Sequence, residues 1–214
     1  MLLLATKTGL LCLDDEGNEA FRALTDRWVR HLAFDADGRL LAIVDDHLVM
    51  GRPLPDDAGD DANWSTLGAV SDLTANCVGD SGDAIFVGAA DARMFVLRGR
   101  GAGPAQRVAA FDRVEGRDAW DTPWGGPPDV RSLAFIRDPD RPAVYADIHV
   151  GGIARSFDRG QTWSPARGRL HRDVHQVATH PDLPDSVFAA TQQGFFRSDD
   201  RGESWSVALE PFLP

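Results

Sequence analysis

Short hydrophobic runs alternate with turns rich in Gly, Asp and Pro along the 214-residue chain. Few stretches keep the 3.6-residue period of an amphipathic helix, whereas runs with the alternation and residue types of β-strands recur from end to end. In the C-terminal half, one layout of strands occurs twice, first over 130–163 and then from 174 to 209. The pattern therefore predicts an all-β protein built from repeated four-stranded units.

An eight-residue sequence marks the same place in both of these units. It reads S-x-D-x-G-x-[ST]-W at 156–163 and again at 198–205, and the two copies start 42 residues apart. A fixed period of about 40 residues with strand-rich contents is typical of a β-propeller blade. We assign a structural role to the shared positions, which are Ser156, Asp158, Gly160, Trp163, Ser198, Asp200, Gly202 and Trp205.

The chemistry of this octapeptide suits a hairpin turn. The carboxylate of Asp158 or Asp200 can accept hydrogen bonds from the backbone N–H groups that follow it. The Gly two positions later supplies a positive φ without steric cost. The Trp then begins the next strand and offers a large apolar surface for packing. Calcium binding by these carboxylates is disfavoured, because each turn contributes too few of them.

These residues resemble the Asp-box, or BNR repeat, of sialidase-like propellers, which are grouped with WD40- and YVTN-type repeat proteins. The resemblance implies blades of four antiparallel strands, with the Asp-boxes on the face opposite the ligand site. The strand pattern indicates about five units in a single domain over 1–214, and the first unit lacks an opening strand. Family members often have seven blades, so we expect a five-bladed ring or, slightly favoured, a truncated seven-bladed ring.

The third unit differs from the last two. We expect its strands at 73–78, 84–88, 93–98 and 106–111, and its outer turn lacks the octapeptide. The connection that follows, 112–129, is longer than the others and rich in Asp, Trp, Gly and Pro. Long connections in compact repeat folds are usually functional or disordered.

Composition narrows the range of partners. The formal net charge is −11 and the pI is about 4.8, which argues against nucleic acid or an anionic membrane. Cys12 and Cys77 lie in apolar runs and are expected as buried thiols, not as a disulfide. Residues 1–5 lack the features of a signal peptide, and no run could span a membrane. We expect a cytoplasmic protein without a cofactor.

In a propeller, the first strand of each blade lines the channel. The connections that enter these strands share one face with the hairpins between second and third strands, and the octapeptide turns share the other. The second residue of the first strands is Arg30, Thr74, Arg131 and His175. With neighbouring loop residues, this scheme predicts a polar and aromatic ligand-binding rim. The predicted rim residues are Arg30, Trp120, Asp121, Trp124, Arg131, His149, Asp173 and His175.

Two features of this rim have more than one interpretation. The tryptophans of 120–131 can form a stacking floor for a sugar or aromatic ligand, or a structural plug over the channel. His149 and His175, with Asp173 or Asp121, would suit a divalent ion. Because no H-x-H or H-x-x-x-H spacing supports a metal centre, we assign none.

The resemblance to sialidases also implies a possible glycosidase. Such enzymes clamp a carboxylate with three arginines and use a tyrosine nucleophile. Here Arg30 and Arg131 would be two arms of the clamp, the places for a third hold Thr74 and His175, and the single tyrosine, Tyr145, falls within a strand. We therefore favour a non-catalytic scaffold whose rim binds a small anionic or sugar-like ligand or a protein partner. The alternatives are a glycoside hydrolase and an assembly subunit that docks through an open blade edge.

Overall fold

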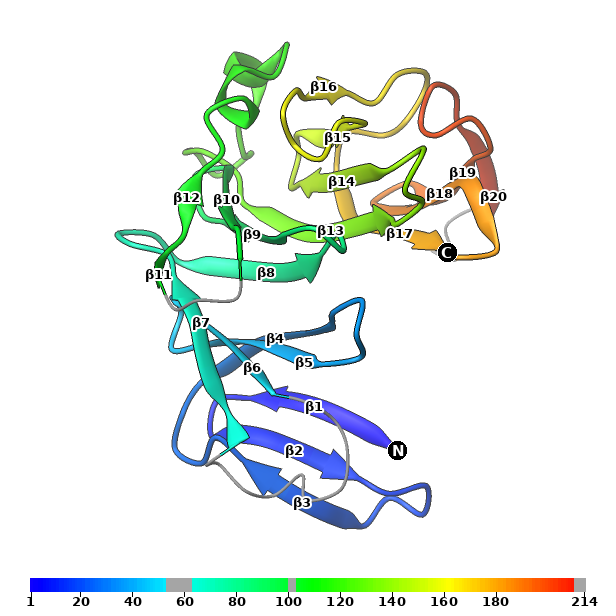
Figure 1. Cartoon of the computed structure of the whole chain (residues 1–214). Helices are drawn as coiled ribbons and strands as arrows, with labels where there is room; N and C mark the ends of the chain where they lie inside the picture. Colours follow the sequence, from blue (N-terminus) through cyan, green and yellow to red (C-terminus); the bar gives the residue numbers. More distant parts are fainter. Residues whose placement is uncertain (53–62, 100–102, 210–214) are drawn as a thin grey trace.

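The computed structural model describes residues 1–52, 63–99 and 103–209. It is an all-β structure of five antiparallel sheets that fan around a common centre (Figure 1). Sheet 1 contains β1 (Leu2–Thr6), β2 (Gly9–Leu13) and β3 (Glu19–Ala23). Sheet 2 contains β4 (Val29–Phe34), β5 (Leu40–Val44), β6 (Leu48–Arg52) and β7 (Ser65–Ala69). Sheet 3 contains β8 (Ala75–Asp80), β9 (Ile85–Ala89), β10 (Arg93–Leu97) and β12 (Gln106–Arg107).

The last two sheets carry the matching octapeptides. Sheet 4 contains β13 (Val130–Ile136), β14 (Ala143–Ile148), β15 (Gly152–Ser156) and β16 (Ser164–Pro165). Sheet 5 contains β17 (Val174–His180), β18 (Leu183–Thr191), β19 (Gly194–Ser198) and β20 (Ser206–Leu209). Within each sheet the strands named above run in sequence order from the centre outward, as the sequence pattern predicted, and sheet 2 gains one further edge strand, β11 (Gly103–Pro104).

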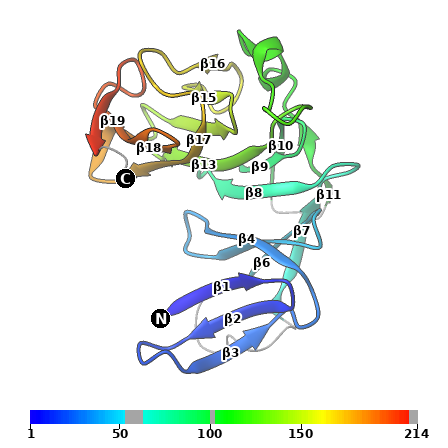
Figure 2. The same ribbon diagram turned by 180° about the vertical axis from the view of Figure 1, so that it is seen from behind.

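The first strands β4, β8, β13 and β17 lie side by side at the centre of the fan. Among the described residues sheet 1 has no such strand, and its β1 packs beside β4 as the second strand β5 packs beside β8. The expected incomplete first unit is therefore confirmed. No strand pairing joins sheet 5 to sheet 1 within the described residues, and Figure 2 shows the two end sheets apart. The number of blades in a closed ring stays a prediction.

Each of the four central strands contains a β-bulge one residue after its start. The register shifts between Val29 and His31, Ala75 and Cys77, Val130 and Ser132, and Val174 and Gln176. A bulge leaves one residue unpaired and turns its side chain out of the regular alternation. The four unpaired residues are Arg30, Asn76, Arg131 and His175.

This repeated bulge corrects one sequence assignment. Thr74 was expected to stand beside Arg30, Arg131 and His175, but the equivalent residue is Asn76, because β8 begins at Ala75 and not at Leu73. Alternation within a strand can be counted from sequence, whereas the exact first paired residue depends on the neighbouring strand.

Side chains next to the bulges join neighbouring sheets. The backbone N–H of Val78 in sheet 3 donates to Nδ1 of His31 in sheet 2, at 3.4 Å. The N–H of Val177 in sheet 5 donates to Oγ of Ser132 in sheet 4, at 2.9 Å. His31 is packed between sheets, as expected, and burial lowers its pKa. These bonds hold adjacent central strands in fixed register.

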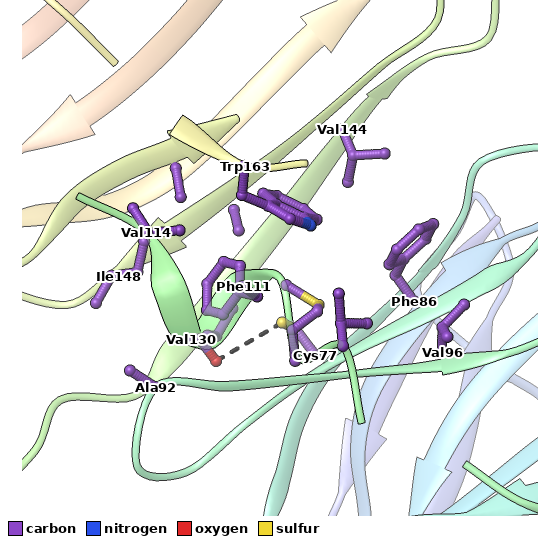
Figure 3. Close-up of a cluster of buried hydrophobic side chains, with 14 of the residues drawn as sticks. Cys77, Phe86, Ala92, Val96, Phe111, Val114, Val130, Val144, Ile148 and Trp163 are labelled. Atoms are coloured by element: carbon purple, nitrogen blue, oxygen red, sulfur yellow. Dashed lines mark hydrogen bonds between the residues drawn. The ribbon is translucent and has the colours of Figure 1, made fainter. Parts of the chain in front are cut away.

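Apolar clusters fill the space between every adjacent pair of sheets. Figure 3 shows the cluster between sheets 3 and 4, where Phe86, Phe111 and Trp163 meet; the rings of Phe111 and Trp163 form an edge contact at 5.0 Å. Cys77 lies in the same cluster and points its sulfur at the carbonyl of Val130. Cys12 and Cys77 are both free and buried, which confirms the expectation of two buried thiols.

The chain after β10 departs from the expected strand at 106–111. Only Gln106–Arg107 pairs as β12, and the chain then turns into two short 3-10 helices, η2 (Phe111–Arg113) and η3 (Arg117–Ala119). Before it, β11 (Gly103–Pro104) crosses to the neighbouring sheet and pairs in parallel with β7. Arg93 and Arg107 both bind Asp112, at 2.7 and 2.6 Å, and anchor the helical segment to sheet 3.

The two octapeptide turns have the same hydrogen-bond network. In the first, the Ser156 hydroxyl donates to Asp158, which also accepts from the N–H and hydroxyl of Thr162. Ser198, Asp200 and Ser204 make the same bonds in the second. The hydrogen bond from the Ser204 hydroxyl lowers the pKa of Asp200 to about 2.

Two details of these turns concern packing. Gly160 has a φ of +84°, and a Cβ there would lie 2.8 Å from the ring of Phe86, so this position requires glycine. Trp163 and Trp205 immediately precede the outer strands β16 and β20 and do not begin them. Both indoles nevertheless pack into inter-sheet clusters.

Candidate functional site

Three side chains converge at the rim between sheets 4 and 5, on the face opposite the octapeptide turns. Oδ1 of Asp173 lies 3.2 Å from Nε2 of His175 and 3.6 Å from Nε2 of His149. The imidazole rings of His149 and His175 lie edge to face, with centroids 6.1 Å apart. His149 is almost fully buried, whereas half of the His175 side chain is exposed. His149 is therefore the buried histidine of the site, and His175 is the one accessible from solution.

Hydrogen bonds to backbone carbonyls fix the geometry of this cluster. The N–H of His149, just after β14, donates to the carbonyl of Asp129 at 3.0 Å. The carbonyl of Arg172 accepts from the N–H of Gly152 at 2.8 Å, and Nε of Arg172 donates to the carbonyl of Val150 at 2.9 Å. These bonds tie the chain entering sheet 5 to the hairpin of sheet 4. Asp173 is thereby held next to His149.

An aromatic side chain covers the cluster from the long connection. Trp124 is 70% exposed, yet its ring lies 5.1 Å from that of His149. Thr122 closes the turn that carries Trp124, because its hydroxyl donates to the carbonyl of Gly125 at 2.9 Å. The Thr122 side chain is itself buried. An exposed indole held by a tight turn is available for stacking against a ligand.

A cation stands beside the same cluster. Arg131 is the unpaired residue of the β13 bulge and is exposed. It makes no hydrogen bond or ion pair with the part of the chain that the structure describes. Its charge acts on the titration of both His149 and Asp147, so it lies within electrostatic range of both groups. A guanidinium without an internal partner can bind an anion from solution.

Burial is the main influence on the charge states beneath the site. It lowers the pKa of His149, and the Arg131 guanidinium lowers it further, so this imidazole is neutral at pH 7. Burial also raises the pKa of Asp147 to about 8. Oδ2 of Asp147 accepts a hydrogen bond from Ser132 at 3.0 Å, whereas its Oδ1 has no partner among the described residues. Asp147 is therefore a largely protonated carboxyl group at neutral pH.

The remaining predicted rim residues lie elsewhere or have other partners. Arg30 forms an ion pair with Asp46 at 2.7 Å and lies over the ring of Trp28, so its charge is satisfied within sheet 2. Trp120 packs on Phe111 with its centroid 6.0 Å away, which favours the plug interpretation for this tryptophan. Asp121 is exposed.

Sequence reasoning missed one residue at the centre. Asn76 occupies the bulge position of sheet 3, and its Nδ2 is buried without a hydrogen-bond partner among the described residues. The sequence held a signal for the bulge position: in β4, β13 and β17 the unpaired residue directly follows a valine, namely Val29, Val130 or Val174. The corresponding residue in β8 is Ala75, and its alanine side chain concealed the match.

Tyr145, the single tyrosine, is fully buried in β14. Its hydroxyl donates to the carbonyl of Arg201 at 3.3 Å, on the side of the octapeptide turns, and burial raises its pKa. A buried phenol on the opposite face cannot attack a ligand at the rim. The rim therefore lacks the tyrosine nucleophile that the sialidase resemblance implied.

Comparisons with known proteins identify the fold. No family model matches the chain, and no curated protein matches it. Among solved structures, one similar protein is PorZ, an essential bacterial surface component of the type-IX secretion system of Porphyromonas gingivalis. That match has a TM-score of 0.60 at 18% identity and covers 99% of this chain and 25% of PorZ.

Two further structures show the same likeness. YCF48 from Cyanidioschyzon merolae matches with a TM-score of 0.54 at 17% identity, over 80% of this chain and 50% of that protein. A GH74 enzyme of Niastella koreensis matches with a TM-score of 0.57 at 19% identity, over 96% of this chain and 29% of the enzyme. The chain thus spans between a quarter and a half of these proteins' lengths.

No helix within residues 1–52, 63–99 and 103–209 is long and apolar enough to cross a membrane. The similar structures are β-propellers, and at these identities the likeness concerns the fold alone. The four-stranded antiparallel sheets, their central strands and the similar structures together establish that this chain has a β-propeller fold.

Proposed function

We propose that this propeller is a non-catalytic binding scaffold whose rim between sheets 4 and 5 holds a small anionic, sugar-like ligand. The observation that carries the proposal is Arg131, an exposed guanidinium without a hydrogen-bond or ion-pair partner among the described residues. Its charge acts on His149, whose ring lies 5.1 Å from the exposed indole of Trp124. A cation for a carboxylate and an aromatic face for a sugar ring are the two elements such a ligand requires.

The contrast with Arg30 supports this assignment. Both arginines occupy the bulge of a central strand, but Arg30 is neutralised by Asp46 and covered by Trp28. For Arg131, we infer that a ligand from solution supplies the anionic and aromatic contacts that Asp46 and Trp28 supply to Arg30. The octapeptide turns on the opposite face support the BNR-type assignment of the chain, because each Asp is fully used within its own turn.

Thermal shift and calorimetry with three sugar acids, glucuronate, galacturonate and N-acetylneuraminate, test the proposal. At least one is expected to raise the melting temperature of the protein. Arg131→Ala should abolish that rise while its own melting temperature stays within about 2 °C of the parent, since an exposed unpaired side chain contributes little to stability. Arg167→Ala is the matched control, because Arg167 is an exposed arginine near the octapeptide turn of sheet 5.

Two results would refute the anionic site. One is the absence of a response to all three sugar acids. The other is a response that Arg131→Ala leaves intact. If Arg131→Ala unfolds the chain, the guanidinium is structural and the proposal also fails.

A second candidate function rests on the outer face of sheet 5. Phe195 and Leu209 are exposed there, and Phe188 stacks on Phe195 with centroids 5.9 Å apart. The corresponding face of sheet 4 is covered by sheet 5. By strand alternation, sheet 1 presents Leu2 and Leu4 on its own outer face, and Leu2 is 54% exposed. We propose that sheet 5 of one copy packs on sheet 1 of a second copy, making the chain an assembly subunit.

Light scattering coupled to size-exclusion chromatography tests this contact. Mass should rise above 23.2 kDa with increasing protein concentration, and Phe195→Glu should return the protein to a monomer. Phe34→Glu serves as the control, because Phe34 is another exposed phenylalanine but belongs to sheet 2. A monomer at every concentration would contradict the second copy as the occupant.

A further inference from the structure

One group of three metal-binding side chains occurs within the described residues, and it lies at the rim. His149, Asp173 and His175 each offer one ligand atom, and these atoms all lie within 4.8 Å of one another. We propose that these three residues bind a divalent transition-metal ion of the zinc class. The inference deepens the proposed function, because the ion would lie where the anionic ligand binds.

The distances between ligand atoms agree with a small ion. Zinc bound tetrahedrally at about 2.1 Å from each ligand places the ligands about 3.4 Å apart. The separations from Asp173 Oδ1 to Nε2 of His175 and to Nε2 of His149 are 3.2 and 3.6 Å. The two imidazole ligand atoms lie within 4.8 Å of each other, so zinc binding requires at most a small movement there. His175 can provide that movement, because half of its side chain is exposed.

The ligand set favours a transition metal over calcium or magnesium. Two imidazole nitrogens and one carboxylate oxygen suit zinc and its neighbours, whereas calcium and magnesium prefer oxygen ligands only. Each residue comes from a defined place: His149 from the hairpin after β14, Asp173 from the entry to β17, and His175 from the β17 bulge. Two hydrogen bonds between Arg172 and that hairpin, one from its side chain and one to its backbone carbonyl, preset the spacing.

Neighbouring charges are compatible with a dication at this point. Arg131 contributes a positive charge at His149. The negative charges of Asp129 and Asp173 act on His149 in the opposite direction. With three protein ligands, a tetrahedral ion keeps one open position. An anionic group can fill that position and meet the Arg131 guanidinium as well, so the ion and the arginine would bind the same ligand.

Calorimetric titration of the chelator-treated protein with zinc chloride tests the site. We expect one zinc ion per chain, whereas magnesium chloride should give no binding at the same concentration. Cobalt(II), added in place of zinc, should give the visible absorption of a tetrahedral nitrogen–oxygen site. Asp173→Asn and His175→Ala should each weaken zinc binding at least about tenfold. His180→Ala should leave it unchanged, since His180 is an exposed histidine at the far end of β17.

His149→Ala is a less useful variant, because His149 is buried and its loss can disturb folding. Asp173 and His175 are more accessible, and circular dichroism of their variants checks that the fold is kept. Zinc binding that survives both Asp173→Asn and His175→Ala would overturn the proposal, as would the absence of zinc binding.

Failure of the metal site can be separated from failure of the anionic site. Sugar-acid binding that persists in the presence of a chelator and depends on Arg131, with no zinc binding, would refute only the ion. Stoichiometric zinc binding that depends on Asp173 and His175, without any sugar-acid response, would refute only the anionic ligand. The two measurements together therefore decide both proposals.

Discussion

Sheets 4 and 5 share one layout but have different surroundings. Registration of their strands makes Tyr145 equivalent to Phe188, and Ile153 equivalent to Phe195. Tyr145 and Ile153 are buried, whereas Phe195 is 38% exposed. The difference arises because sheet 5 covers this face of sheet 4 with apolar side chains such as Val187, and no described sheet covers sheet 5. The comparison shows that an apolar strand pattern marks a face for burial, while only a neighbouring sheet buries it.

The polar residues of the two sheets show the same contrast. Arg155 in sheet 4 is 2% exposed and reaches across to sheet 5, where it donates to the carbonyl of Arg201 and to Glu203. Its equivalent, Arg197, remains within its own sheet and pairs with Asp199. The same arginine position therefore joins two sheets in sheet 4, but forms only a surface ion pair in sheet 5. Surface pairs of this kind contribute little to stability.

Truncation of the two equivalent aromatic residues gives the largest expected difference. Tyr145→Ala should lower the free energy of unfolding by about 3–5 kcal/mol, because it leaves a cavity between two sheets. Phe188→Ala should cost about 1 kcal/mol or less, because no sheet within the described part of the chain covers that face. Urea unfolding followed by circular dichroism measures both. Equal costs would mean that sheet 5 is covered in solution, for which the second-copy contact is the first explanation to test.

The buried carboxyl of sheet 4 provides a second, smaller contrast. Asp147 is equivalent to Ala190 in sheet 5, so only sheet 4 has a titrating group at this place. The pKa of Asp147 is raised from 3.8 to about 8 by burial. Well below pH 3.8 the group is protonated in both folded and unfolded chains. Above it the unfolded chain loses the proton first, and stability falls as pH rises towards 8.

Replacement by asparagine should remove this loss. Asp147→Asn keeps an acceptor for the Ser132 hydroxyl but does not titrate, so its stability relative to the parent should grow by about 2–3 kcal/mol between pH 5 and pH 7. Urea unfolding at several pH values measures the difference. Asp140→Asn is the control, because Asp140 is an exposed aspartate of the same sheet, in the turn between β13 and β14. Parallel pH curves for the parent and Asp147→Asn would show that Asp147 is ionised when folded.

Local features of the fold were accessible from the residues themselves. Asp158 and Asp200 bond to the backbone within their own turns, and Gly160 and Gly202 adopt positive φ, so these turns depend on a few neighbouring residues only. The strand layout followed from hydrophobic alternation for the same reason. The predicted strand at 106–111 was wrong, because Phe111 leaves the sheet and packs beside Trp163.

The rim shows where sequence reasoning reaches its limit. The scheme of central strands and connections placed Arg131, His149, Asp173 and His175 on one face, and the structure brings the ligand atoms of the last three within 4.8 Å of one another. It could not distinguish Arg131 from Arg30, because the ion pair with Asp46 joins residues 16 apart across a hairpin. Nor could it distinguish the exposed Trp124 from the packed Trp120, whose contact with Phe111 depends on how η2 folds back.

By itself, the sequence determined the repeating unit of this protein: four strands, a self-bonded turn and a following tryptophan. Turn chemistry and alternation act over a few residues, so they can be read along the chain. Only the tertiary structure decided which residue occupies each bulge, which arginine has no partner among the described residues, and which apolar face is covered. These outcomes depend on contacts between sheets, and such contacts join residues that lie far apart in the chain.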